Sequence, residues 1–518
     1  MRRIVTSLDA DVVVVGSGFG GSLTALVCRR LGLSTVLLER GRHPRFAIGE
    51  SSSPLANLLL REIASRYGLP RVAPLAAWGS WKRERPELRC GKKRGFTFYS
   101  HIPGEAAAPR ADRELLVAAS PRDEVADTHW YRPDVDRFLA EEAASAGAEY
   151  LDEVELSRLE RTPRGLRLEA TRRGATLAVR GRLVVDASGP RGFLHRALGL
   201  GEKGFETLAE TEALYAHFSG APSYEDLGLV PETTSAPYHP DDAALHHLFP
   251  GGWVWVLRFD DGLVSAGVAA ERAVARELRL EEGEPAWRRL LERIPALERH
   301  LGPGAAATPF FHRPIPFRSA AASGPGFLLL PSAAASIDPL LSTGFPLTLL
   351  GIERLGAALE RDWGTPSLGR SLARIAALSL READAAARLV GALYRAFGDP
   401  PLFRALALLY FAAASYAEAA RRLGRPRLAE SFLLTGTEPF GRLLRTLSRR
   451  AAMGTRDDRG RERLLDALAR AIVPIDVAGL SVEGRTRFPH RAADLVASAS
   501  KLGATAREAE AALAAGGL

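Results

Sequence analysis

The chain has 518 residues, of which 46% are hydrophobic and 25% charged, as in a globular protein with more than one domain. The formal net charge is +8, but the basic residues are scattered and do not alternate with aromatic ones, which argues against nucleic-acid binding. Two cysteines exclude a disulfide framework, and no apolar run reaches the roughly 18 residues of a membrane span. A strand pattern begins close to the N-terminus and leaves no room for a signal peptide. We therefore expect a cytoplasmic protein with no integral membrane segment.

A nucleotide-binding turn is predicted near the N-terminus. Residues 11–15 have the pattern of a buried strand, and Gly16, Gly18 and Gly21 follow it at the start of a helical pattern. Glycines at this spacing let a phosphate approach a helix N-terminus. Glu39 lies 18 residues beyond Gly21, where a second strand ends and a ribose hydroxyl needs an acceptor. The order of strand, glycines, helix and acid indicates a dinucleotide site.

The remaining elements follow from hydrophobic periodicity. Helices are predicted near residue 54, over 134–146 and from about 370 onwards, and an antiparallel meander over 150–180. Further strands are predicted within 87–102, where Gly-Phe-Thr-Phe-Tyr-Ser alternates, and at 182–189, 252–259, 263–268 and 327–330. We interpret the strands near 185 and 328 as belonging to the first sheet. The fold class is thus α/β, with a discontinuous Rossmann-type domain (1–200 and 321–370), an inserted β-sheet substrate domain (201–320) and a helical C-terminal region (371–518).

Several further motifs accompany the glycine turn, at residues 44–51, 130–136, 184–189 and 337–344. With it they resemble the flavin-dependent halogenase group, tryptophan halogenase-like, of the FAD-dependent monooxygenase superfamily, over about residues 9–360. The resemblance implies FAD as the cofactor, and it implies these cofactor-binding residues: Gly16, Gly18, Gly21, Glu39, Arg40, Ile48, Gly49, Glu50, Ser51, Arg132, Asp186, Gly189, Asp338 and Gly344.

The segment before Gly344 carries a second chemical argument. Ser342, Thr343 and Gly344 open a helical pattern, and its first N–H groups and dipole suit either a reduced flavin or a halide. The resemblance implies that this segment wraps the flavin and holds the halide. The alternative is an ordinary helix start capped by Ser342 or Thr343.

Lys93 is the candidate catalytic residue. The chain has five lysines, and three of them lie at positions 82, 92 and 93. The resemblance places an essential lysine ahead of a Gly-aromatic-x-Phe strand, where its amine directs an electrophilic halogen to an aromatic ring. Lys92 is the rival, because adjacent strand residues face opposite sides. A solvated lysine pair at a strand start is the alternative to both.

Trp253 and Trp255 are spaced to share one strand face. The resemblance implies that they form a wall between flavin and substrate, and the alternative is a pair of core tryptophans. The chain also departs from the family pattern. Arg258 replaces a proline, Pro331-Ser332 replaces Gly-Asp, Ser336 replaces an aromatic residue and Leu341 replaces an acidic one.

Three functions stay open. The first is an FAD-dependent oxidoreductase that uses reduced FAD and O2 to oxidise halide and halogenate an electron-rich aromatic small molecule. The second is an FAD-dependent monooxygenase or reductase without halide, which the departures favour, and the third is a flavin-holding scaffold. No second nucleotide-binding turn follows a strand, so we expect reduced flavin from a separate reductase or from brief NAD(P)H docking. The histidines are isolated or adjacent, and we expect no metal site.

Overall fold

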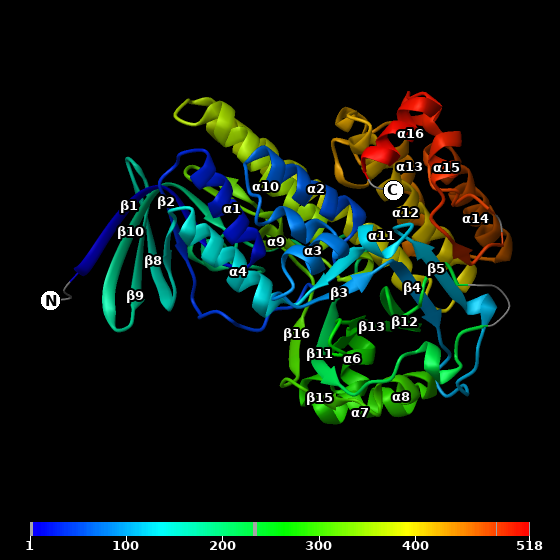
Figure 1. Ribbon diagram of the computed structural model, residues 1–518. Helices are drawn as coiled ribbons and strands as arrows, with labels where there is room; N and C mark the ends of the chain where they lie inside the picture. Colours follow the sequence, from blue (N-terminus) through cyan, green and yellow to red (C-terminus); the bar gives the residue numbers. More distant parts are fainter. Residues whose placement is uncertain (1–3, 232–235, 483, 517–518) are drawn as a thin grey trace.

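The computed structural model describes residues 4–231, 236–482 and 484–516. Figure 1 shows one sheet at the N-terminal end of the molecule, a second sheet below its centre, and C-terminal helices packed beside both. The α/β class and the Rossmann-type arrangement predicted from the sequence are confirmed.

The first sheet has the strand order β18-β19-β10-β1-β2-β7, and its central strands run parallel. Residues 12–15 at its centre are almost fully buried, because helices cover a parallel sheet on both faces. Strands β8 and β9 extend β10 as the predicted antiparallel meander. The strands of this sheet are β1 (Ile4–Val15), β2 (Thr35–Leu38), β7 (Glu149–Leu151), β8 (Val154–Thr162), β9 (Gly165–Arg172), β10 (Ala175–Asp186), β18 (Ser323–Gly324) and β19 (Phe327–Leu329).

Helices pack on this sheet and on one another. Helix α1 packs on α4 and α10, and α10 packs on α2. Their bounds are α1 (Phe19–Arg30), α2 (Pro54–Arg66), α3 (Trp78–Glu84), α4 (Arg132–Ser145), α5 (Phe193–Ala197), α9 (Pro331–Ala334) and α10 (Gly344–Asp362). The helices predicted near 54 and over 134–146 are α2 and α4.

The second sheet has the order β15-β11-β14-β13-β12-β4-β5-β21, with β16 beside β11. It takes β4 and β5 from residues before 200, so it extends outside the predicted 201–320 segment. Its strands are β4 (Gly95–Ser100), β5 (Glu114–Ala118), β11 (Thr211–Ser219), β12 (Ala244–Phe249), β13 (Gly252–Arg258), β14 (Val264–Glu271), β15 (Ala305–Ala306), β16 (Phe311–Pro314) and β21 (Arg487–Phe488). Two short pairs stand apart: β3 (Cys90–Lys93) with β6 (Asp127–Trp130), and β17 (Phe317–Arg318) with β20 (Ala335–Ser336).

The two faces of this sheet have different covers. One face packs on α6 (Arg272–Leu278), α7 (Glu284–Arg293) and α8 (Pro295–Leu301), with Trp287 in that core. On the other face the rings of Phe96 and Phe98 contact Phe411 and Phe403 of α12. The sheet therefore lies between a helical layer of its own and the C-terminal helices.

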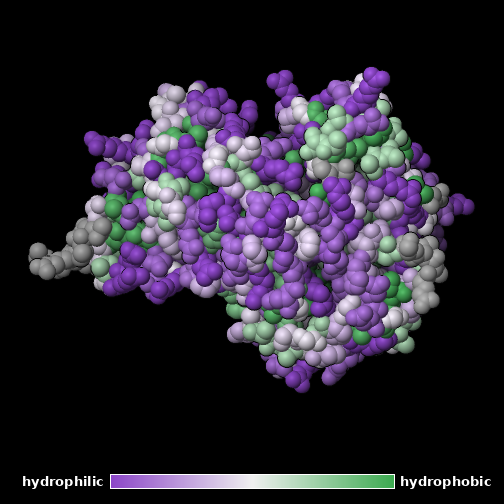
Figure 2. Space-filling model, viewed as in Figure 1, coloured by the Kyte–Doolittle hydropathy of each residue, from purple (hydrophilic) through white to green (hydrophobic). Residues whose placement is uncertain are grey.

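The C-terminal region consists of α11 (Ser367–Arg395), α12 (Pro400–Arg422), α13 (Phe440–Met453), α14 (Asp458–Ile472), α15 (Ala492–Ala497) and α16 (Ala506–Ala515). Within the described ranges, α12 is the one helix long and apolar enough to cross a membrane, and 72% of its apolar window is buried inside the protein. Burial of this kind is typical of a core helix. Figure 2 shows that this face of the molecule is mainly hydrophilic, with paler and greener residues over the C-terminal helices.

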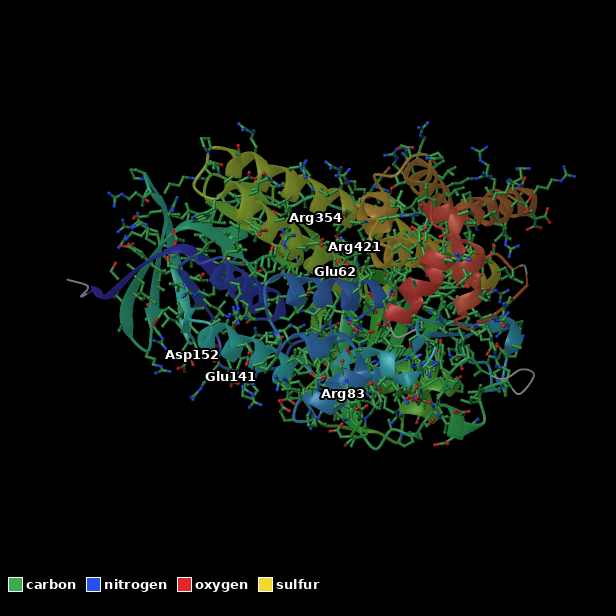
Figure 3. All side chains as sticks on the ribbon, turned by 45° about the horizontal axis from the view of Figure 1, so that its top comes forward. Glu62, Arg83, Glu141, Asp152, Arg354 and Arg421 are labelled. Atoms are coloured by element: carbon green, nitrogen blue, oxygen red, sulfur yellow. The ribbon has the colours of Figure 1, made fainter. Side chains whose placement is uncertain are left out.

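Ion pairs join these helices to the first domain. Arg421 on α12 bonds Glu62 on α2 at 2.6 Å and Glu353 on α10 at 2.9 Å. Arg354 on α10 forms a bidentate salt bridge with the buried carboxylate of Glu382 on α11, with two hydrogen bonds of 2.7 Å each. Figure 3 labels Glu62, Arg354 and Arg421 close together where these helices meet. The contacts fix α11 and α12 against α2 and α10.

Candidate functional site: the glycine turn, the 338–344 segment and the buried lysine

The glycine turn has the geometry that the spacing predicts. Gly16 has a φ of +97°, and a Cβ there would lie 2.8 Å from the carbonyl oxygen of Ala187. A Cβ on Gly21 would lie 1.9 Å from the carbonyl oxygen of Gly16, so α1 can begin this close to β1 only without a side chain. Gly18 at the start of α1 has no side chain to cap the helix, so an anion can approach this N-terminus, where the first amide, that of Phe19, donates to Asp136.

Glu39 is buried directly after β2 and faces this turn. Its carboxylate accepts hydrogen bonds from the amides of Ser17 at 3.0 Å and Gly41 at 2.8 Å, and from Arg45 at 3.1 Å. Burial by itself would raise the pKa of Glu39, but the charge of Arg45 and the two amides outweigh it and lower the pKa to about 2. Glu39 is thus an ionised acceptor at neutral pH, whereas Arg40 is exposed.

Arg132 joins three parts of the site. Its guanidinium pairs with Asp136 at 2.8 Å and donates to the carbonyl oxygens of Ile48 and Gly49. Asp136 in turn accepts the backbone N–H of Phe19, at the start of α1. The predicted Arg132, Ile48 and Gly49 therefore lie together beside the glycine turn. Asp186 is buried after β10 and accepts from Ser188 and Leu194, so it shapes the loop that contains Gly189.

Glu50 and Ser51 point to different neighbours. The Glu50 carboxylate bonds His217 of β11 at 2.8 Å, which links the first domain to the second sheet. Ser51 accepts a hydrogen bond from the amine of Lys93 at 2.9 Å, and the Ser52 carbonyl accepts another at 2.5 Å.

The two neighbouring lysines face opposite ways, as strand alternation requires. Lys93 is fully buried, and its Nζ lies 3.8 Å from the centroid of the Phe96 ring. Lys92 points outward and pairs with Asp123 at 2.7 Å and Asp242 at 2.9 Å. Lys93 is therefore the lysine that points inward, whereas Lys92 is partly exposed and forms ion pairs.

The 338–344 segment is held from three sides. Asp338 is buried and accepts from Trp253 Nε1 at 3.0 Å, from Tyr394 Oη at 2.7 Å and from the amide of Leu340 at 3.0 Å. Leu341 and Ser342 have φ values of 67° and 55°, an uncommon conformation for residues other than glycine. The carbonyl oxygen of Leu341 accepts from Tyr410 Oη of α12 at 2.8 Å.

Helix α10 begins after this tight turn without a side-chain cap. Ser342 and Thr343 are buried, whereas Gly344 is exposed, and a Cβ there would meet no atom within 4 Å. The N-terminus of α10 therefore faces open space. The alternative of a cap by Ser342 or Thr343 is thus not formed, and the helix amides are available to a ligand.

Trp253 and Trp255 share a sheet face, with ring centroids 5.7 Å apart, as their spacing predicts. The Trp253 ring also contacts His246 in a tilted arrangement, whereas the adjacent His247 points into the opposite core. Arg258, where the family has proline, donates to the carbonyl oxygens of Ala221 and Pro222. Among the described residues, no cluster of three or more His, Cys, Asp or Glu side chains could hold a metal ion.

A pocket with a cavity volume of about 100 Å³ lies next to Phe96. The buried amine of Lys93 contacts the Phe96 ring but does not line the pocket. Its apolar wall includes Phe96, Pro346 of α10 and Phe411 of α12. The polar side chains lining it are Ser53, Ser415, Glu418, Arg422, His490 and Arg491. The C-terminal helices thus cover this pocket, a role that the sequence left open.

A family model described as FAD dependent oxidoreductase matches residues 11–336, more than half of the chain. The chain belongs to this family of FAD-dependent oxidoreductases. FAD is the cofactor of the family, as predicted. The site fits it: the glycine turn at the start of α1 suits the diphosphate, Glu39 suits the ribose, and the open N-terminus of α10 suits the flavin ring.

The relatives and solved structures agree with the resemblance to halogenases. The chain is 30% identical over 365 residues to tetracycline 7-halogenase of Kitasatospora aureofaciens, covering 68% of this chain and 64% of that protein. It is 28% identical over 356 residues to monodechloroaminopyrrolnitrin halogenase PrnC of Pseudomonas fluorescens, covering 67% and 61%. The chain thus spans about three fifths of the length of these relatives.

Among solved structures, halogenase PltM in complex with phloroglucinol and FAD has a TM-score of 0.82 at 24% identity, covering 93% of this chain and 99% of that one. The flavin-dependent halogenase CmlS has a TM-score of 0.60 at 21% identity, covering 96% and 76%. At this identity the two structures support the fold alone.

Some site residues were not predicted from the sequence. These are Arg45 at the glycine turn, Asn57 and Asp127 near Lys93, and Tyr394 and Tyr410 beside the 338–344 segment. Asp136 was expected from the 130–136 motif together with Arg132. Arg45 lies within the 44–51 motif, so its charge was an available clue. The others come from separate elements and carry no local pattern.

Proposed function

We propose that this chain uses reduced FAD and O2 to oxidise a halide and then halogenates an electron-rich aromatic small molecule. The observation that carries the proposal is the position of Lys93. Its buried amine lies between Ser51, in the segment beside the flavin site, and Phe96, in the wall of the covered pocket. An amine in this position can pass an electrophilic halogen from the cofactor side to an arene.

The chain's own residues account for the other requirements. Bound FAD supplies the oxidation of halide by O2. The start of α10, with Thr343 and Gly344, offers amides to the halide and to the flavin edge. Trp253, on the aromatic face of the second sheet, is held by its hydrogen bond to Asp338 in this segment. The aromatic wall of the pocket suits a planar ring, because offset and edge-to-face contacts between rings are favourable.

The test is incubation of the protein with FAD, a flavin reductase, NADH and either chloride or bromide, with a panel of phenols, indoles and pyrroles. Mass spectrometry is expected to find a product that has gained a halogen. Lys93→Met should lose at least about a hundredfold of this activity, whereas the matched variant Lys92→Met should keep it. No halogenated product with any arene, while FAD binds normally, would reject the proposal.

The second candidate is a monooxygenase or reductase of the same fold that acts on a small organic substrate without halide. It is favoured by Ser336, which is half-buried beside the 338–344 segment where the family has an aromatic residue. Leu341, which stands where an acidic residue is expected, favours it as well. Oxygen insertion or double-bond reduction that persists in Lys93→Met would identify this activity.

We also propose a cytoplasmic location and a separate flavin reductase as the source of electrons. The sequence supports a separate reductase, since no further nucleotide-binding turn follows a strand. A spectrum of the purified protein with NADH, with and without a reductase, tests it: flavin bleaching should require the reductase.

A further inference from the structure

Lys93 and Asp127 face each other in a buried two-stranded ladder. They are register partners in the antiparallel pair of β3 and β6. The side chain of Lys93 is fully buried, and Asp127 is only 4% exposed. An amine and a carboxyl group removed from water together affect one another far more strongly than a surface pair does.

The two groups have unequal hydrogen bonding. The Lys93 amine donates to Ser51 Oγ and to the Ser52 carbonyl oxygen. Asp127 Oδ1 accepts from Asn57 Nδ2 at 2.8 Å, and its buried Oδ2 has no hydrogen-bond partner among the described residues. Asn57 therefore orients Asp127 through Oδ1. The other oxygen, Oδ2, forms no hydrogen bond among the described residues and can affect Lys93 through its charge.

Burial lowers the pKa of Lys93, and the charge of Asp127 opposes this change. Burial likewise raises the pKa of Asp127, and the charge of Lys93 opposes it. The pair can hold one proton either as ammonium and carboxylate or as amine and carboxylic acid, with the same net charge.

The surrounding titratable groups do not replace Asp127 in this role. His129 on β6 and His246 on β12 are buried, which lowers the pKa of each to about 3, so both are neutral near pH 7. On α12, Glu418 and Arg422 are paired with each other at 2.8 Å and largely compensate one another. Asp127 is therefore the charged group whose interaction with Lys93 changes most when the amine loses its proton.

We propose that Asp127 is the positioning residue of Lys93, whose negative charge favours the protonated amine and so sets the pH above which Lys93 becomes an uncharged nucleophile. The proposal rests on the proposed function for the use of that amine. The protonation itself belongs to the protein alone and can be measured without turnover.

The experiment follows the titration of Lys93 by NMR in protein labelled with ¹³C-lysine. The chain has only five lysines, and the Cε signal of Lys93 is identified by its loss in Lys93→Met. In Asp127→Asn the titration midpoint should fall by at least about one pH unit, a tenfold change in the protonation equilibrium. Asp123→Asn, beside the outward Lys92, should leave it unchanged. An unchanged midpoint in Asp127→Asn would overturn the proposal.

A second variant covers the case in which Asp127→Asn does not fold. Asn57→Leu removes the donor to Asp127, favours its neutral form and should also lower the Lys93 midpoint, and an unchanged midpoint there counts against the proposal. The pH profile of halogenation is then compared, and its acidic limb should move to lower pH in the same variant. If the midpoint moves but no variant or wild-type protein halogenates, the proposed function fails while the role of Asp127 stands.

Discussion

Tyr394 on α11 donates a hydrogen bond to Oδ2 of Asp338 at 2.7 Å, across 56 positions of sequence. Burial raises the pKa of Asp338 to about 6, although Tyr394, the Leu340 amide and Trp253 all favour its ionised form. One buried hydroxyl thus ties the C-terminal helices to the segment that precedes α10.

Tyr394→Phe should destabilise the protein by about 2 kcal/mol at pH 8, because a hydrogen bond to an ionised carboxylate is lost. The pKa of Asp338 is raised on folding, so its contribution to stability is present below about pH 4 and is lost as the pH rises through 6. The Tyr394 hydroxyl donates to the ionised form of Asp338, so removing it increases the loss of stability at higher pH. Urea unfolding should therefore show a larger deficit for Tyr394→Phe at pH 8 than at pH 5, and an equal deficit would contradict the assignment.

Gly344→Ala should weaken FAD binding without weakening the fold. A Cβ there meets no protein atom within 4 Å, and alanine is the better helix former by up to about 1 kcal/mol. The methyl group would occupy space in front of the α10 amides, and we expect at least about a tenfold loss of affinity in a fluorescence titration with FAD. Gly369→Ala on α11, also with open space around it, is the matched control. Unchanged affinity in Gly344→Ala would show that the flavin does not approach this turn.

Glu39→Gln should lower stability in a manner that depends on pH. The pKa of Glu39 is depressed on folding from 4.5 to about 2, so its contribution is present above pH 4.5 and is lost as the pH falls towards 2. The deficit of the variant without FAD should reach up to about 3 kcal/mol at pH 7 and shrink steadily below pH 4.5. The measurement is urea unfolding between pH 7 and pH 3. A deficit independent of pH would mean that the charge of Glu39 is not what stabilises the turn.

Arg421→Met should separate the C-terminal helices from α2 and α10. The side chain of Arg421 is only 8% exposed, and its loss leaves Glu62 and Glu353 without the cation that both of them bind. We expect a loss of about 3 kcal/mol and faster proteolysis of the region after residue 370. Arg83→Met removes the ion pair with Glu124 on the surface, labelled in Figure 3, and should cause no measurable change. Similar stability of the two variants would contradict this ranking.

Sequence reasoning was most successful where one short segment contains the whole signal. Gly16, Gly18 and Gly21 follow a buried strand, and their role depends on backbone geometry within a few residues. Alternation along β3 likewise showed that only one of Lys92 and Lys93 points inward. The resemblance favoured Lys93, and in the structure Lys93 is the lysine that points inward.

Sequence reasoning was weakest where contacts join distant segments. Asn57 and Asp127 are 70 positions apart, and nothing in either segment marks them as partners. The helices after 370 were recognised, and packing against the protein's own core was the default expectation for their apolar faces, with a cover over the substrate cavity, a second subunit or a membrane surface as alternatives. Their packing over the pocket, through residues such as Phe411, depends on how the two sheets are placed.

The sequence by itself determined the family, the cofactor and the first sheet, because glycine spacing and hydrophobic periodicity are local properties. Only the tertiary structure decided which side chains share the buried environment of Lys93 and which residues hold the 338–344 segment. The physical reason is that burial and charge pairing depend on distance in space, and a buried carboxyl such as Asp127 or Asp338 acquires its properties from neighbours that chain folding brings to it.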